Sequence, residues 1–238
     1  MYLDINNSSP IIKITNLAYS MSQFQSEELP TGRIRRIQER TEVARANLIA
    51  AGVPLFSERG FDAVSVRDIE IAADVNRGML AYHFVDKEQL WRAVADFTFQ
   101  QIVAQRDVRL DMMKDISDRE GLALMIRFYV RFYAEHPELS RLMAQEARQE
   151  SWRIDYLVEN HIRPGSLQLE QHVRKILNLS AREFAHWYYI MVSSSATIFS
   201  FEPECKRLFG FNPRNEDVIE THADMLVNML LGNEKLSQ

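Results

Sequence analysis

The spacing of apolar residues along the chain predicts helices almost throughout. The first helical face begins after Thr41 and recurs at intervals of four, three and four residues, at Ala44, Leu48, Ala51 and Leu55. Pro54 lies inside this segment and lacks a backbone N–H group, so we expect a kink or a break after Gly52. No run of alternating apolar and polar residues indicates a β-strand. The pattern therefore predicts an all-α protein.

Two short helices are predicted next, with a tight turn between them. Ser65 and Asp68 have the spacing of a capping box, which predicts a helix that ends near Asp74. Aspartate tolerates the left-handed backbone conformation that a tight turn needs. Asn76 is a candidate cap for the next helix, over residues 77–84. Together with the helix that precedes them, these two helices have the order of a helix-turn-helix module.

Longer helices are predicted after this module. The sequence Asp86-Lys87-Glu88-Gln89 opens one long helix, and Ser180 with Glu183 forms a second capping box. Further helices are expected over residues 120–135, 138–150, 152–177, 181–201 and 215–231. These segments predict a helical bundle that is larger than the helix-turn-helix module.

The N-terminal residues differ from the rest of the chain. Residues 1–30 show no sustained period of helix or strand, and they include Pro10 and Pro30. We therefore expect three parts: an N-terminal tail or arm over 1–32, a helix-turn-helix domain over 33–85, and a helical ligand-binding and dimerisation domain over 86–238.

Charge separates one segment from the others. The chain has 28 Lys and Arg residues against 33 Asp and Glu residues, which gives a net charge of −5. Between residues 33 and 45, however, only Glu39 and Glu42 oppose a block of arginines. Such a block is either the solvated face of a helix or an arm that contacts phosphates. The arginines of the block are Arg33, Arg35, Arg36, Arg40 and Arg45.

Composition excludes several classes of protein. The single cysteine, Cys205, cannot form an internal disulfide, and no leader segment opens the chain, which together favour the cytoplasm. The longest stretch without Asp, Glu, Lys or Arg runs from Phe184 to Phe201 and contains several polar residues, so we expect a buried helix and no membrane span. We find no phosphate-binding loop, nucleophile elbow or zinc-protease motif. The chain is therefore predicted to have no cofactor, no metal site and no enzymatic activity.

The second helix of the predicted turn carries side chains that suit a DNA major groove. Small and polar groups at its start, beginning with Asn76 and Arg77, would reach base edges, while Tyr82 and His83 would reach phosphates. Helix starts near Ser65 and Asp86 would offer backbone amides to phosphates. The candidate DNA contacts are Arg36, Ser65, Val66, Arg67, Asn76, Arg77, Gly78, Met79, Tyr82, His83 and Lys87.

An ordered set of residues in this region also has the spacing of a known domain. The set comprises Ala50-Ala51, Leu55-Phe56, Glu58-Arg59-Gly60-Phe61, Ser65-Val66-Arg67-Asp68-Ile69, Ala73, Val75, Gly78, Leu80, His83-Phe84 and Lys87-Glu88 followed by Leu90. With these residues, the segment 41–95 resembles the DNA-binding domain of the TetR family of transcriptional repressors. The resemblance implies a repressor that binds a palindromic operator in double-stranded DNA and is released by a small-molecule effector.

The chain departs from the usual pattern of that family at four places. Glu70 stands where a small residue is usual in the second helix, Asp74 replaces a glycine in the turn, and Pro54 interrupts the first helix. Ala81 stands where a tyrosine is usual, and Tyr82 follows it. Either Tyr82 makes the operator contact from about 100° around the helix, or that contact is missing.

The resemblance further implies a homodimer and an effector site. The two most apolar helices, over 184–201 and 218–231, are candidates for a contact between subunits, unless they only fill the core of one subunit. Arg127, Gln145, His161 or His186 would orient an effector. The candidate effector-lining residues, each of which could instead be core, are Met125, Phe128, Phe132, Trp152, Tyr156, Trp187, Tyr188 and Met191.

Two other functions remain open from the sequence. A regulator that has lost or weakened DNA binding could act through protein contacts, and Glu70, Asp74 and Ala81 favour this alternative. A di-iron helical-bundle enzyme would use the Glu-x-x-His spacing of Glu183 and His186, but such a site needs a second copy of the motif, and the chain has none. The sequence does not specify the operator, the effector or the sign of regulation.

Overall fold

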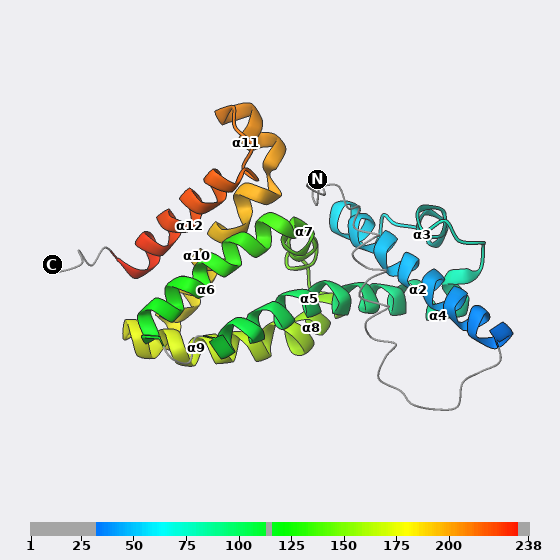
Figure 1. The fold of residues 1–238 in the computed structure, drawn as a ribbon, viewed down its shortest axis with the longest axis horizontal. Coiled ribbons are helices and arrows are strands. Elements are labelled where there is room, and N and C mark those ends of the chain that lie inside the picture. The colour runs from blue at the N-terminus through cyan, green and yellow to red at the C-terminus, as the bar shows by residue number, and fades with distance from the viewer. Residues whose placement is uncertain (1–31, 113–115, 233–238) are drawn as a thin grey trace. The chain divides into compact units, whose positions relative to one another are not determined.

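The computed structural model describes residues 32–112 and 116–232, so the predicted tail lies outside the described residues except for its last position (Figure 1). The described residues are mostly helical and contain no strand, which confirms the predicted all-α fold. They form two compact units, and the division along the chain falls between Phe97 and Thr98. This division falls later in the chain than the boundary expected after residue 85, because the first half of the long helix packs into the first unit.

The first unit is built on three helices and the start of a fourth. They are α2 (Gly32–Arg59), α3 (Val66–Ala72), α4 (Met79–Phe84) and the beginning of α5 (Lys87–Met112). Their core is apolar and closed: Leu48, Phe56, Ile69, Leu80 and Trp91 are all fully buried. Helices α3 and α4 both pack against α2, so the first helix supports the two short ones.

Helix α2 corrects the expectation of a break after Gly52. It runs without interruption from Gly32 to Arg59, with Pro54 inside it. A proline in a helix interior costs about 3 kcal/mol, whereas each large apolar side chain that the helix buries contributes roughly 1.5–3 kcal/mol. Leu48 and Phe56 flank Pro54 and are completely buried, while Pro54 is exposed. Tertiary burial therefore carries the helix through the proline.

The arginine block lies on the same helix, which begins earlier than its apolar spacing predicted. Arg40 and Arg45 are exposed, as expected for a solvated helix face. The side chains of Arg33, Arg35 and Arg36 lie outside the described residues.

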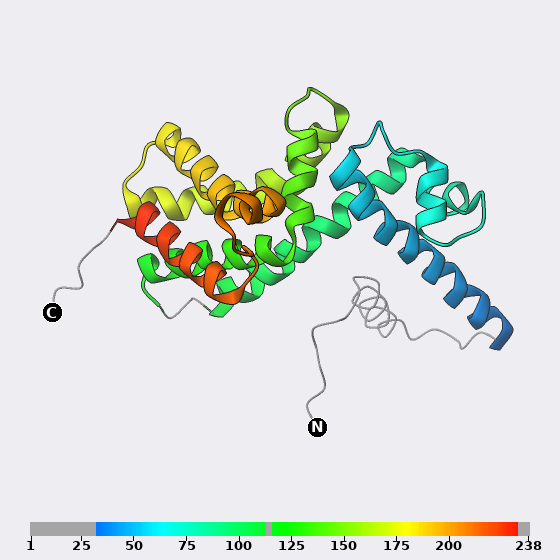
Figure 2. The same ribbon diagram turned by 90° about the horizontal axis from the view of Figure 1, so that it is seen from above.

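The second unit contains the rest of α5 and a bundle of further helices (Figure 2). In this bundle α6 packs against α7, α9, α10 and α12, and α10 also packs against α7, α9, α11 and α12. Ile126, Val130 and Phe132 on α6 and Met191 and Phe199 on α10 are buried at the centre. The helices are α6 (Asp118–Glu135), α7 (Pro137–Glu146), α8 (Trp152–Leu157), α9 (Arg163–Leu177), α10 (Ala181–Ser200), α11 (Glu202–Phe209) and α12 (Glu216–Leu231), with a π-helical turn, Val158–Ile162, between α8 and α9.

Most predicted helix ends are confirmed in this unit. Ser180 and Glu183 form the expected capping box at the start of α10, and Asn178 ends α9 in the left-handed conformation. Three details differ from the predictions. The helix expected over 138–150 ends at Glu146, and a π-helical turn connects α8 to α9 before Pro164. Helix α11 was not predicted, because its eight residues follow directly on the helix expected over 181–201. Among the described residues, no helix combines the length and the apolar character needed to cross a membrane.

Candidate nucleic-acid interface

The start of α3 is fixed by a complete capping box. The Ser65 hydroxyl oxygen accepts a hydrogen bond from the Asp68 amide at 3.1 Å, and Asp68 Oδ2 accepts one from the Ser65 amide at 3.0 Å. The Ser65 hydroxyl also donates a hydrogen bond to Asp68 Oδ2 at 2.6 Å, and this bond, followed by the one from the Ser65 amide, holds the pKa of Asp68 below its usual value. Val66 and Arg67 follow directly and are exposed together with Ser65. The residues predicted at this helix start therefore lie on the surface of the first unit.

The turn between α3 and α4 has two residues in the left-handed region. Asp74 has φ of 53°, as predicted from its tolerance of this conformation. Gly78 has φ of 89° and is the residue before α4. The expectation that Asn76 caps a helix over 77–84 is wrong: α4 begins at Met79, because the left-handed Gly78 cannot lie inside a right-handed helix.

A buried carboxylate holds the start of α4. Glu70 on α3 is only 5% exposed. Its Oε1 accepts hydrogen bonds from the Gly78 amide at 2.8 Å and from the Leu80 amide at 3.1 Å. Sequence reasoning treated Glu70 only as a departure from a family pattern, since nothing local connects it to residues eight and ten positions further along.

Helix α4 has one buried and one exposed face. Leu80 and Phe84 are buried in the core, whereas Tyr82 is 71% exposed. Arg77 and Asn76 are exposed just before the helix, and Met79 is half-buried at its first position. The exposed set therefore combines a guanidinium and an amide just before a short helix with a phenol on the exposed face of that helix.

Two further candidates make contacts within the protein. Lys87 Nζ donates hydrogen bonds to the backbone oxygens of Phe61 at 3.0 Å and Val64 at 2.9 Å, and it lies 4.1 Å from the centre of the Phe61 ring. It thereby ties the loop before α3 to the start of α5. His83 is half-buried, and its Nε2 is buried without a hydrogen-bond partner. Burial, followed by the nearby charge of Arg45, lowers the pKa of His83.

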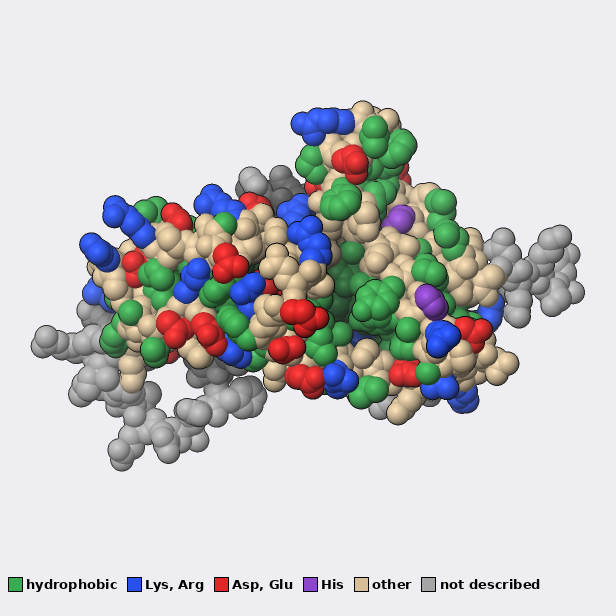
Figure 3. All heavy atoms as spheres, turned by 180° about the vertical axis from the view of Figure 1, so that it is seen from behind, with side chains coloured by type: hydrophobic (Ala, Val, Ile, Leu, Met, Phe, Trp, Pro, Cys, Tyr) green, Lys and Arg blue, Asp and Glu red, His purple; other side chains and the backbone are tan. Residues whose placement is uncertain are grey.

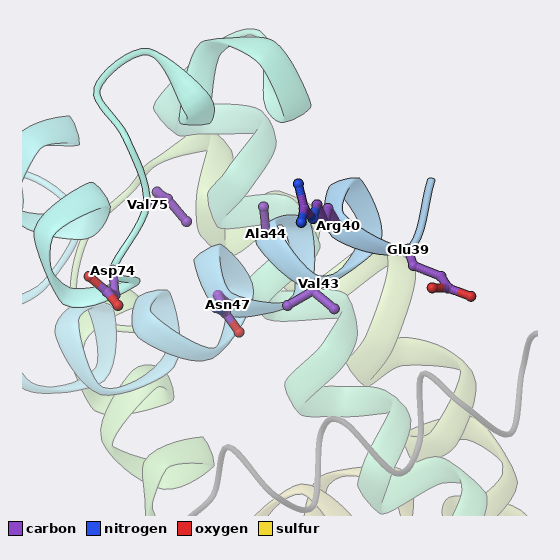
Figure 4. A pocket seen from close by; sticks show the side chains of 7 residues that line it. All are labelled: Glu39, Arg40, Val43, Ala44, Asn47, Asp74 and Val75. Atoms are coloured by element: carbon purple, nitrogen blue, oxygen red, sulfur yellow. The ribbon is translucent and has the colours of Figure 1, made fainter. Parts of the chain in front are cut away.

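A pocket of about 350 Å³ opens on the same unit (Figure 4). Side chains of α2, including Arg40 and Val43, lie on one side of it, and Asp74 and Val75 of the turn lie on the other. Asp74 thus places an exposed carboxylate beside the first helix.

The residues predicted to line an effector site lie in the second unit. Met125, Phe128 and Phe132 are buried on α6, and Trp187 and Met191 are buried on α10. These two helices pack against each other. The other candidates, Trp152 and Tyr156 on α8 and Tyr188 on α10, are half-buried.

Sequence reasoning missed two tyrosines in this interior. Tyr129 stacks on Tyr133 with ring centres 6.4 Å apart, and its hydroxyl is hydrogen-bonded to Arg106. Burial raises the pKa of both phenols, and it raises the pKa of Tyr188 to about 12. Because α6 is apolar on two sides, spacing alone does not mark these tyrosines as internal polar groups.

The Glu-x-x-His spacing on α10 has a structural use. Glu183 Oε2 accepts a hydrogen bond from the Ser180 amide at 2.8 Å, so its carboxylate belongs to the cap of the helix. The part of the chain that the structure describes contains no group of three His, Cys, Asp or Glu side chains suited to hold a metal ion.

Comparison with known proteins agrees with this geometry. Residues 48–94 match the model of the family described as bacterial regulatory proteins, tetR family. The match is to the helix-turn-helix segment of the chain, because the matched residues include α3, the turn and α4 of the first unit.

Individual TetR-like proteins extend the comparison. The HTH-type transcriptional repressor NicS of Pseudomonas putida is 28% identical over 109 residues, which is 45% of this chain and 50% of NicS. An HTH-type transcriptional repressor of Mycobacterium tuberculosis is 35% identical over 99 residues, 41% of this chain and 48% of that protein. The chain therefore spans about half the length of the curated relatives it matches.

A solved structure supports the fold of the TetR-like chain over a greater length. The fatty acid degradation regulator FadR from Bacillus halodurans superposes with a TM-score of 0.61. The superposition covers 81% of this chain and 96% of FadR at 16% identity. At this identity the likeness shows the all-α architecture of both proteins.

Proposed function

We propose that the protein is a sequence-specific DNA-binding transcriptional regulator, a homodimeric repressor that a small-molecule effector releases from its operator. The observation that carries this proposal is the exposed surface around α4: Asn76 and Arg77 are exposed just before the helix and Tyr82 is exposed on it, while the other face of the helix is buried. In the helix-turn-helix mode, such a helix enters a major groove. The match of residues 48–94 to the tetR family model supports the same use.

The contacts divide into two kinds. Asn76 and Arg77 have the donor geometry that reads base edges. Val66 and Arg67, at the capped start of α3, are suited to phosphates and fix register without reading sequence. The family usually has a tyrosine at the position of Ala81. The exposed phenol of Tyr82 follows directly, so Tyr82 makes the operator contact of that tyrosine from the next position around the helix. Lys87 supports the loop before α3 and would act on DNA mainly through that support.

An exposed apolar surface on α10 and α12 supports the homodimer. Tyr189 and Ile190 on α10 and Met225 and Met229 on α12 are all more than half exposed. A groove of about 340 Å³ lies between these helices. Figure 3 shows that apolar side chains are also exposed on the face of the second unit that is turned away from the viewer in Figure 1. Two copies of the surface on α10 and α12 pack as a four-helix contact around a two-fold axis. The axis would present two α4 helices to one palindromic duplex.

The effector would bind in the second unit, where aromatic and sulfur-containing side chains of α6 and α10 meet internal phenols. Binding there would favour a subunit arrangement that fits the operator less well. A coupling of about 1–3 kcal/mol changes DNA affinity roughly 5–150-fold, which is enough for release. The proposed effector contacts, the absence of enzymatic activity and the cytoplasmic location remain predictions.

Selection from a random duplex library tests the proposal. The protein should enrich a palindromic site, and Arg77→Ala should weaken binding to it by about 1–3 kcal/mol and relax the preference at one base pair. Arg148→Ala, which removes an exposed arginine of the second unit, is the matched control and should leave binding unchanged. A dimer that enriches no sequence would overturn the proposal and favour the regulator that acts through protein contacts, for which exposed Asp74 is the supporting observation.

A further inference from the structure

Glu70 connects three parts of the turn at once. Its side-chain Oε1 accepts hydrogen bonds from the Gly78 and Leu80 amides, and its backbone oxygen accepts one from the Val75 amide at 3.1 Å. The carboxylate is buried between α3 and α4 and does not face the solvent. One residue of α3 thus holds both the turn and the first turn of α4.

Helix α4 needs such an external acceptor. It has only six residues, and a helix of that length is not stable alone in water. The first amides of any helix lack partners within the helix. Gly78, the residue that precedes α4, has no side chain with which to cap it. Glu70 supplies both the missing acceptor and a negative charge at the positive end of the helix dipole.

The exposed candidate contacts are attached directly to the atoms that Glu70 holds. Arg77 precedes Gly78, and the Tyr82 amide donates a hydrogen bond to the Gly78 backbone oxygen at 3.1 Å. A change in the position of Gly78 therefore moves both side chains together. No comparable link connects Glu70 to the start of α3, because Ser65 and Asp68 cap that end by themselves.

We propose that Glu70 is a positioning residue. It fixes the orientation of α4 relative to α3 and thereby sets the sequence preference of the protein. This inference rests on the proposed function. Glu70 would contribute to the reading of bases by positioning α4. It would not contribute to the attraction of phosphates, since its buried carboxylate touches no DNA. Loss of the carboxylate should reduce discrimination between sequences more than it reduces binding to DNA in general.

The experiment measures two dissociation constants at fixed salt, one for the duplex enriched from the random library and one for a duplex of scrambled sequence. Glu70→Ala leaves the Gly78 and Leu80 amides without an acceptor and should lower the ratio of the two affinities by about tenfold or more. Binding to the scrambled duplex should change by less than about twofold, and its salt dependence should stay the same. Glu70→Gln keeps a side-chain oxygen and should retain the ratio within about threefold.

A matched control separates positioning from stability. Ser180→Ala removes the cap of α10 in the second unit, so it should lower the melting temperature without changing the affinity ratio. Should Glu70→Ala fail to fold, Glu70→Asp takes its place, because it keeps the charge but withdraws the carboxylate by one methylene group. An affinity ratio that survives Glu70→Ala or Glu70→Asp, or that falls equally in Ser180→Ala, overturns the proposal.

Amide hydrogen exchange gives a readout that needs no DNA. The Gly78 and Leu80 amides should exchange at least about tenfold faster in Glu70→Ala, and Glu70→Gln should restore most of their protection. Unchanged exchange in Glu70→Ala would overturn the inference even if the wild-type protein binds its duplex. Conversely, if the wild type enriches no sequence, the proposed function fails while the exchange rates still show whether Glu70 holds α4.

Discussion

The two units stabilise their helices in different ways. In the first unit, α3 and α4 have seven and six residues, and side chains from outside the helix or at its edge fix them: Ser65 caps α3, Glu70 caps α4 and Lys87 holds the loop before α3. In the second unit, helices such as α6 and α10 have 18 and 20 residues and are held mainly by burial of apolar side chains. Short helices cannot bury enough surface to fix their own position, so polar anchors take over that task.

The largest effect is expected from removing a buried apolar side chain from the second unit. Phe132 on α6 is 2% exposed and packs against the rings of Phe128 and His136. Phe132→Ala should lower the free energy of unfolding by about 3–5 kcal/mol, because it removes buried surface and leaves a cavity. Urea denaturation followed by circular dichroism measures this loss. Leu124→Ala, at an exposed position of the same helix, should cost less than about 1 kcal/mol, and equal losses would contradict the comparison.

Breaking a polar anchor should have an intermediate effect. Lys87→Met removes the ammonium group that donates hydrogen bonds to two backbone oxygens. The free energy of unfolding of the first unit should fall by about 1–3 kcal/mol. The salt dependence of DNA binding should stay unchanged. Lys175→Met, which breaks an exposed ion pair with Asp118, is the control and should cost less than about 1 kcal/mol. If Lys87→Met instead leaves stability intact and lowers the slope of DNA affinity against salt concentration by the amount expected for one phosphate contact, Lys87 binds a phosphate.

The smallest effect concerns pH. Burial lowers the pKa of His83 below its usual value near 6.5. The unfolded chain therefore binds a proton at a higher pH than the folded protein does. The stability that this histidine contributes is complete above about pH 6.5 and is lost as the pH falls from there through the folded-state value. Denaturation curves between pH 7.5 and 5, compared with those of His83→Gln, should show this loss only with His83 present; a gain in stability on acidification would contradict it.

The sequence predicted local features well. The capping boxes at Ser65 and Ser180, the left-handed turn at Asp74 and the end of α9 at Asn178 are all present in the structure. Each depends on residues that lie within about four positions of one another, so their spacing is visible in the chain. The helix-turn-helix module and the all-α fold follow from the same local patterns.

The features that the sequence left undecided depend on distant residues. Pro54 suggested a break that the burial of Leu48 and Phe56 prevents. Lys87 was predicted as a DNA contact from its position alone, and the residues near it in the sequence do not indicate that its ammonium donates hydrogen bonds to backbone oxygens more than twenty positions earlier. Nothing in the chain marks these partners, because their proximity results from packing.

The amino-acid order by itself therefore determined the all-α type of this protein and the place of α4, the helix proposed to face DNA, since periodicity and capping act between near neighbours. Only the tertiary structure decided what Glu70 does. Its carboxylate meets the Gly78 and Leu80 amides only after α3 and α4 pack on α2 and exclude water from the space between them. A buried polar group takes its role from the partners that packing brings to it.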